Sequence, residues 1–171
     1  MNKNMTSKIS RYGLLIALAF LFSYIENLFP VHLGIPGVKL GLANLVIFVA
    51  LYSDGWKGAL TISIIRIFLV GFTYTNTFSM IYSLAGGTLS FLLMLLCKKT
   101  AKFSRVTVSI VGGVAHNIGQ IIIAAIVLQN VNLFYYFPVL MIAGIVTGAL
   151  IGLLGEAILS TDTYIYDGTS K

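Results

Sequence analysis

Long runs of apolar residues alternate with short polar segments along the whole chain. The runs show no period-two alternation of apolar and polar side chains, which favours helices over the strands of a barrel. A helix needs about 20 mostly apolar residues to cross roughly 30 Å of hydrocarbon. The pattern therefore predicts six spans, at about residues 10–29, 40–53, 56–73, 77–97, 106–129 and 133–159.

Short polar turns separate most of these predicted spans. They are SDGWKG (53–58), TYTN (73–76), KKTAKFSR (98–105) and QNVN (129–132). The second span is short for a bilayer, so we expect it to be tilted, broken or continued by the segment before it. No fixed repeat and no disordered linker divide the chain, which predicts a single integral membrane domain over residues 1–171, ending in a polar tail.

Composition agrees with a lipid environment. Of the 171 residues, 58% are hydrophobic and 9% are charged, with a mean hydropathy of +0.96. Soluble domains carry about 25% charged residues, so this chain has too few ionisable groups to solvate a globule. The first apolar run, from Tyr12 to Phe29, is too long for a signal peptide and is expected to be a retained span. The single cysteine, Cys97, excludes an intrachain disulfide.

The positive charges predict the topology, because cytoplasmic loops of membrane proteins are enriched in lysine and arginine. With the N-terminus inside, six spans place both termini in the cytoplasm, and the only cation in an outer loop is Lys39. The net charge of +6 is thus a topological signal and not a nucleic-acid footprint, and we expect a multi-pass protein of the bacterial plasma membrane. The cations on the inner side are Lys3, Lys8, Arg11, Lys57, Lys98, Lys99, Lys102, Arg105 and Lys171.

The connection between the first two predicted spans, PVHLGIPGVKLG (30–41), is rich in proline and glycine. These residues interrupt helices, and irregular backbone at membrane depth needs cover from protein or water. Two interpretations remain open. The connection is an ordinary surface loop, or residues 30–39 form a re-entrant lid over a cavity and bring Lys39 inward.

Ionisable side chains inside spans cost about 2.5–3.5 kcal/mol, so they mark candidate sites. His116 and Gln120 lie four residues apart and share one helix face, with Asn117 beside them. They are either hydrogen-bonding contacts between helices or ligand contacts. A metal site is disfavoured, because the chain offers two histidines and no paired carboxylates.

Arg66 also lies within a span and has two candidate partners. It forms an ion pair with Glu26, or its planar fork binds an anionic headgroup. If the lid folds inward, Lys39 becomes a second cation beside it. In the first span, Gly13 and Ala17 form a small-residue surface of the kind that promotes helix association in membranes.

Motifs for catalysis are absent from the sequence. It has no GxxxxGK[ST] phosphate-binding loop, no HExxH and no Ser-His-Asp arrangement. The only aspartates are Asp54, Asp162 and Asp167, so no DDxxD pair exists to hold magnesium diphosphate. We therefore expect no enzymatic activity in this chain, and no cofactor or metal.

Four segments carry a family resemblance: PGVKLGLANL (36–45), IRIFLVGF (65–72), SLAGG (83–87) and GGVAHNIGQ (112–120). They resemble the Gx transporter family, whose members are often labelled heptaprenyl diphosphate synthase component I. Six spans in so short a chain resemble the substrate-binding S components of energy-coupling factor (ECF) transporters. The resemblance implies a membrane receptor that works with a transmembrane coupling protein and cytoplasmic ATPase subunits, and its coupling surface is similar to the face of Gly13 and Ala17.

We therefore expect an all-helical six-span S component that captures a vitamin-like, isoprenoid or quinone-precursor molecule, amphipathic and anionic, for ATP-driven uptake. Two alternatives stay open: a membrane accessory subunit of a polyprenyl diphosphate synthase, and a structural membrane protein without transport. The predicted substrate-binding residues are Glu26, Lys39, Asn44, Arg66, His116, Asn117 and Gln120.

Overall fold

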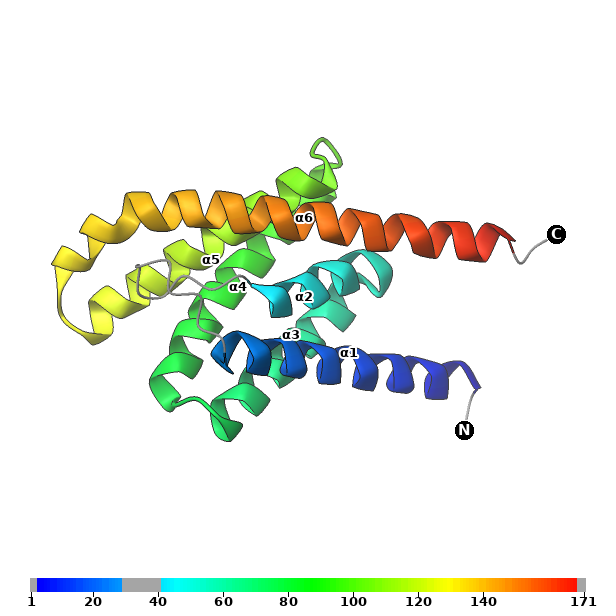
Figure 1. Ribbon diagram of the computed structural model, residues 1–171, viewed down its shortest axis with the longest axis horizontal. Coiled ribbons are helices and arrows are strands. Elements are labelled where there is room, and N and C mark those ends of the chain that lie inside the picture. The colour runs from blue at the N-terminus through cyan, green and yellow to red at the C-terminus, as the bar shows by residue number, and fades with distance from the viewer. Residues whose placement is uncertain (1–2, 29–40, 169–171) are drawn as a thin grey trace. The chain divides into compact units, whose positions relative to one another are not determined.

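The computed structural model describes residues 3–28 and 41–168, and this part of the chain is helical, with no strand (Figure 1). The predicted lid, residues 30–39 with Lys39, lies outside the described residues. The elements are α1 (Lys3–Leu28), α2 (Leu42–Ser53), α3 (Gly55–Thr73), α4 (Thr77–Thr100), α5 (Arg105–Val127), the 3-10 helix η1 (Val131–Tyr136) and α6 (Phe137–Gly168).

Within residues 3–28 and 41–168, five segments are long and apolar enough to cross a membrane. They are Met5–Leu28, Gly55–Thr73, Thr77–Thr100, Arg105–Val127 and Val131–Thr161. The prediction of an all-helical, multi-pass membrane protein is thereby confirmed. The apolar helix α2 has 12 residues, which is about 18 Å of helix and too short to cross the hydrocarbon alone. A count of six spans therefore depends on what precedes α2.

Two helix ends run beyond the predicted spans. Helix α1 starts at Lys3, ahead of the predicted residue 10, and α6 continues to Gly168, past residue 159 and through most of the predicted polar tail. Hydropathy marks only the part of a helix that suits lipid, whereas backbone hydrogen bonding continues into the polar ends. At its start α6 carries Pro138 in the first turn, where a missing N–H breaks no helical hydrogen bond.

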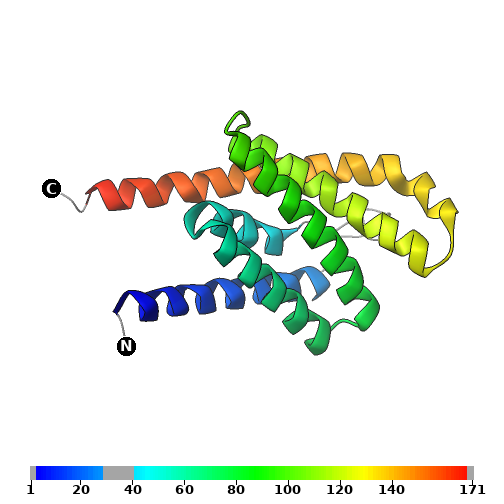
Figure 2. The ribbon, with the colours of Figure 1, turned by 180° about the vertical axis from the view of Figure 1, so that it is seen from behind.

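The chain divides into two compact units, residues 1–84 and 85–171, with the boundary inside α4. In the first unit, α1, α2 and α3 pack against one another, as Figures 1 and 2 show from opposite sides. Helix α2 supplies most of the core, with Phe48 and Leu51 among the most deeply buried large side chains. By contrast, Ala19 is the one apolar residue of α1 that is fully buried among those described. The long helix α1 thus packs on the unit with little apolar burial.

The backbone before α2 is shaped by Gly41. This residue is in the left-handed conformation, with φ of 78°, which glycine adopts without steric cost. Its carbonyl accepts from the backbone N–H of Asn44 at 2.8 Å, closing the first turn of the helix. One glycine of the PGVKLGLANL segment therefore sets where α2 begins.

In the second unit, α5 and α6 run antiparallel with glycines between them. A Cβ added at Gly113 would lie 2.5 Å from the carbonyl oxygen of Gly144. One at Gly148 would lie 2.7 Å from the Cα of Ile110, and one at Gly152 would lie 2.8 Å from the Cα of Val106. The two backbones approach along several turns because these positions have no side chain, as small residues allow in membrane helices.

Candidate functional site

The C-terminal half of α1 holds Glu26, whose carboxylate reaches the start of α2. Its Oε1 accepts hydrogen bonds from the backbone N–H groups of Gly41 and Leu42, the second at 3.0 Å. Helix starts leave backbone donors without partners, and they carry the positive end of the helix dipole. Glu26 therefore caps α2 from a neighbouring helix. Its assignment as a substrate-binding residue stays a prediction.

Arg66 extends from α3 to the same face of α1. Its Nη1 donates to the Ser23 Oγ at 3.4 Å, a long hydrogen bond, and its buried Nε has no hydrogen-bond partner. Both Arg66 and Glu26 are described, and no ion pair joins them, although the carboxylate lies within electrostatic range. Since Ser23 and Glu26 are three residues apart on α1, the structure brings the two charged groups to one helix face.

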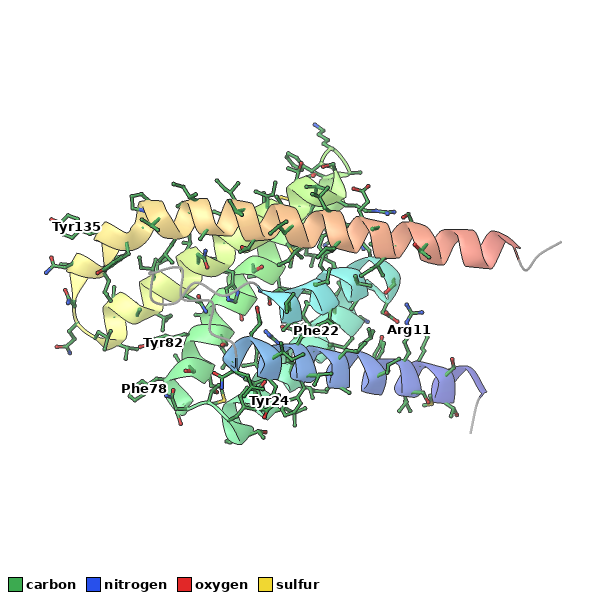
Figure 3. All side chains as sticks on the ribbon, in the orientation of Figure 1. Arg11, Phe22, Tyr24, Phe78, Tyr82 and Tyr135 are labelled. Carbon is green, nitrogen blue, oxygen red and sulfur yellow. The ribbon has the colours of Figure 1, made fainter. Side chains whose placement is uncertain are left out.

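Tyr74, which follows α3, borders this cluster. Its hydroxyl donates to the carbonyl oxygen of Phe20 at 3.1 Å, and its ring makes edge-on contacts with Phe20 and Tyr24; Figure 3 labels Tyr24 on α1. Burial raises the pKa of the Tyr74 hydroxyl above its ordinary value, so the group stays protonated and able to donate. Tyr74 thus fixes the end of α3 against α1, one turn from Ser23.

Asn44 occupies the first turn of α2 and is half-buried. It lies three residues beyond Gly41, the residue whose N–H binds Glu26. Among the described residues, the first unit therefore holds three of the predicted site residues, Glu26, Asn44 and Arg66. Glu26 belongs to the C-terminal half of α1 and Arg66 contacts the same half, whereas Asn44 belongs to α2, the helix that Glu26 caps.

In the second unit, His116 and Gln120 face α4 at Gly86. A Cβ added at Gly86 would lie 2.8 Å from the carbonyl oxygen of His116 and 2.9 Å from the Cγ of Gln120. At Gly119, an added Cβ would lie 2.8 Å from the carbonyl oxygen of Ala85. The shared face predicted for His116 and Gln120 is thus present, and it meets a closely packed crossing of α4 and α5.

Asn117 turns toward a different helix. Its side-chain Nδ2 donates to the carbonyl oxygen of Leu140 in the first turns of α6, at 2.7 Å. Gly113, one turn earlier, also packs on α6 through Gly144. The predicted cluster on α5 is therefore divided between two neighbours, and Asn117 acts as a hydrogen-bonding contact between helices.

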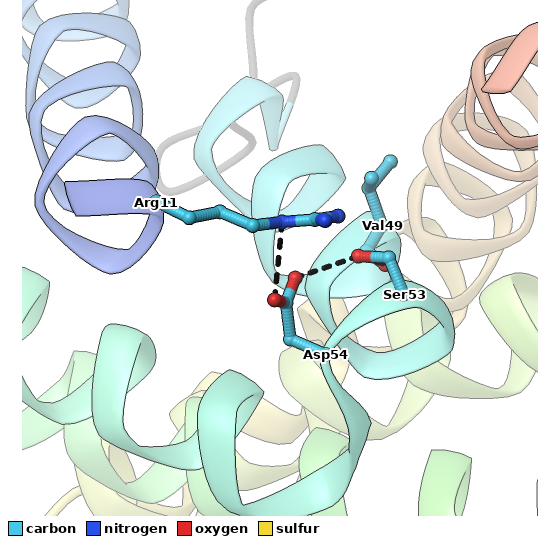
Figure 4. A network of polar contacts seen from close by, with 4 residues as sticks. All are labelled: Arg11, Val49, Ser53 and Asp54. Atoms are coloured by element: carbon cyan, nitrogen blue, oxygen red, sulfur yellow. Dashed lines mark hydrogen bonds and ion pairs between the residues drawn. The ribbon is translucent and has the colours of Figure 1, made fainter. Parts of the chain in front are cut away.

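A second polar network lies at the turn between α2 and α3 (Figure 4). Asp54 accepts from the Ser53 hydroxyl at 2.7 Å, and its Oδ1 lies 3.1 Å from the Nε of Arg11 on α1. Sequence reasoning missed this pair. Arg11 and Asp54 are more than forty positions apart and flank different predicted spans. Their opposite charge was the only feature of the sequence that favoured a contact.

The small-residue face of α1 is open within the described structure. Gly13 and Ala17 are exposed, and a Cβ added at Gly13 would have no neighbour within 4 Å. By contrast, the glycines of the α5–α6 contact all lie against backbone atoms of the facing helix; they are Gly113, Gly144, Gly148 and Gly152. Among the described residues, no group of three or more His, Cys, Asp and Glu side chains gathers in a metal-binding arrangement.

Comparison with known families gives one match. The sequence model of the family described as heptaprenyl diphosphate synthase component I matches residues 15–158, which is most of the chain. No curated protein and no solved structure matches the chain.

Proposed function

Because this chain belongs to the heptaprenyl diphosphate synthase component I family, the label often given to Gx transporters, we propose that it is the substrate-binding membrane subunit of an ECF-type importer. In this role it captures a small molecule from outside the cell and releases it inward when cytoplasmic ATPase subunits act through a transmembrane coupling protein. Multiple apolar helices of spanning length support the membrane half of the proposal.

The observation that carries this proposal is the state of Arg66. A guanidinium within a membrane span is costly unless its donors are satisfied. Here one donor makes a long bond to Ser23, the buried Nε makes none, and the nearby carboxylate of Glu26 is occupied by the backbone of α2. The Arg66 guanidinium is thus held in place by the protein but incompletely paired, which favours binding of an anionic ligand.

This arrangement favours an anionic headgroup on an otherwise apolar molecule, of the vitamin-like, isoprenoid or quinone-precursor kind. Arg66 binds the headgroup, and Glu26 positions the start of α2 beside it. Lys39 is the proposed second cation, and Asn44, His116, Asn117 and Gln120 are proposed hydrogen-bonding residues. A purely cationic substrate is disfavoured, because Glu26 already has two hydrogen-bond donors.

The proposal also covers topology and partners. Both termini face the cytoplasm, the chain crosses the membrane six times, and the protein resides in the bacterial plasma membrane. The exposed face of Gly13 and Ala17 is the proposed contact for the coupling protein, since small residues let a partner helix approach closely.

Mass spectrometry of the purified full-length protein in detergent tests the function. We expect a small anionic molecule to be retained by the native protein and lost from Arg66→Ala while the thermal unfolding midpoint stays close to native. Arg11→Ala is the matched control. It removes one positive charge near the start of α1, whereas Arg66 contacts the other half of that helix from α3. Retention by Arg66→Ala, or loss from both variants alike, would refute the headgroup assignment.

The family's own description supports a second candidate, a membrane accessory subunit of a heptaprenyl diphosphate synthase. This function predicts that a soluble prenyl synthase co-purifies with the chain and that its product length or rate depends on it. Co-purification of such an enzyme with no retained small molecule would favour this candidate over import. A stable protein that retains neither would leave a structural role.

A further inference from the structure

The turn between α4 and α5 gathers positive charge at a bilayer surface. It consists of residues 101–104, and the two helices that it joins are each long and apolar enough to cross a membrane. A connection of four residues cannot carry its side chains far from the helix ends. The turn and its flanking residues therefore lie at the level of lipid headgroups.

The charge of this turn is isolated along the chain. Lys98, Lys99, Lys102 and Arg105 fall within eight positions, and the sequence has no aspartate or glutamate from residue 55 to residue 155. The next carboxylate, Glu156 on α6, follows Gly152, which packs on Val106 at the start of α5. Glu156 thus lies one helical turn beyond this contact, toward the turn between α4 and α5, where it offsets at most one of the four positive charges; Lys99 and Lys102 are both exposed.

An apolar ring lies among these cations. Phe103 directly follows Lys102 and leaves 49% of its surface exposed. The next residue, Ser104, caps α5, and its hydroxyl oxygen accepts from the Thr107 N–H at 3.1 Å. Lysine stems and an exposed aromatic ring together match the membrane interface, where the ring enters the acyl boundary and the ammonium groups stay at headgroup level.

We propose that Lys99, Lys102 and Phe103 form a binding site for an anionic phospholipid, with the two ammonium groups on the headgroup phosphate and the ring between neighbouring acyl chains. A lipid fits this surface better than a soluble anion, because a soluble anion has no use for the exposed ring. Each lysine or arginine near an anionic membrane contributes about 1 kcal/mol, which is about fivefold in affinity. The site is independent of the import proposal and requires only that the helices span a bilayer.

Native mass spectrometry of the full-length protein, titrated in detergent with phosphatidylglycerol or phosphatidylcholine, tests the site. We expect preferential retention of phosphatidylglycerol, weakened about fivefold by Lys99→Gln and about twenty-five-fold by Lys99→Gln with Lys102→Gln. The matched control is Lys8→Gln with Lys57→Gln, which removes two exposed lysines elsewhere and should weaken retention much less than the double change in the turn. Phe103→Ser should weaken retention without changing the net charge.

Three results would overturn the proposal. Equal loss from the two double variants would show a general charge effect and no site. Full competition by inorganic phosphate, with no effect of Phe103→Ser, would identify a soluble anion as the ligand. Unchanged lipid retention by Lys99→Gln with Lys102→Gln, accompanied by loss of a cytoplasmic protein from membrane extracts, would assign the turn to a protein partner.

Discussion

The two units of this protein hold their helices together in different ways. In the first unit, α1 buries little apolar surface and is attached by polar contacts at both ends, through Arg11 to Asp54 and through Glu26 to the start of α2. In the second unit, α5 and α6 approach through glycines such as Gly113 and Gly148, so that backbone lies against backbone.

This difference has a physical consequence. Close backbone packing between helices in lipid depends on shape, and a single added side chain disrupts it over several turns. A polar attachment depends on a few groups, so it can be released or re-formed without repacking a core. We therefore expect the second unit to be rigid and α1 to be the element of the first unit whose position responds to charge.

The largest effect is expected where a side chain is placed between α5 and α6. Gly148→Leu puts its Cβ against the backbone of Ile110 and Ser109, at 2.7 and 2.8 Å, and should lower stability by about 3 kcal/mol or more. Thermal unfolding in detergent measures this. The same change at Gly13, where nothing lies within 4 Å, is the control; equal losses at both positions would remove the contrast between the units.

A smaller loss is expected from Glu26→Ala. The N–H groups of Gly41 and Leu42 lose their acceptor, which should cost about 1–3 kcal/mol and loosen the first turn of α2. Glu26→Gln keeps an oxygen acceptor, so its stability should fall between that of Glu26→Ala and that of the native protein. Hydrogen exchange at Leu42 and Asn44 reports the cap directly, and unchanged exchange in Glu26→Ala would contradict the capping role.

The ion pair of Arg11 and Asp54 should contribute less. Arg11 is 43% exposed, so water and salt weaken the interaction, and a double-mutant cycle with Arg11→Ala and Asp54→Ala should give a coupling of about 0.2–1 kcal/mol. Unfolding measured at low and high salt should show the coupling shrink. A coupling that salt does not alter would indicate packing by the arginine stem and no charge interaction.

The smallest effect on stability is expected from Gly13→Leu. Because an added Cβ has no neighbour within 4 Å and leucine favours a helix interior over glycine, the free energy of unfolding should not fall and should rise by no more than about 1 kcal/mol. Association with a coupling protein, measured by co-purification, should nevertheless be lost if this face is the docking surface. Gly71→Leu on α3 cannot replace Gly13→Leu as an uncrowded position, because its Cβ would meet the side chain of Met80.

Much of the fold follows from hydropathy. The predicted spans 56–73 and 77–97 agree with α3 and α4 to within a few residues, because lipid requires long helices with satisfied backbones. The sequence analysis did not predict that the polar ends of α1 and α6 are helical, because hydropathy identifies only the apolar part of a helix. The pairing of Arg11 with Asp54 was also missed, because periodicity says nothing about which helix an exposed charge meets.

Among the predicted site residues, the sequence indicated which ones share a helix face but not which helices they meet. His116 and Gln120 share a face, as four-residue spacing requires on a helix, and Arg66 and Glu26 reach one face of α1. Asn117 differs, because its neighbour in space is the carbonyl of Leu140 on another helix. Spacing fixes directions around one helix axis and leaves the partner undetermined.

By itself, the sequence determined the solvent, the helical class and the few polar groups that lipid makes costly. These depend on local composition and on the 3.6-residue period, which are properties of each segment alone. Only the tertiary structure decided that Glu26 caps α2, that Arg66 is left incompletely paired and that Gly13 is open while Gly148 is covered. Each of those facts depends on which helices meet, and the free energy of that choice is shared among residues far apart in the chain.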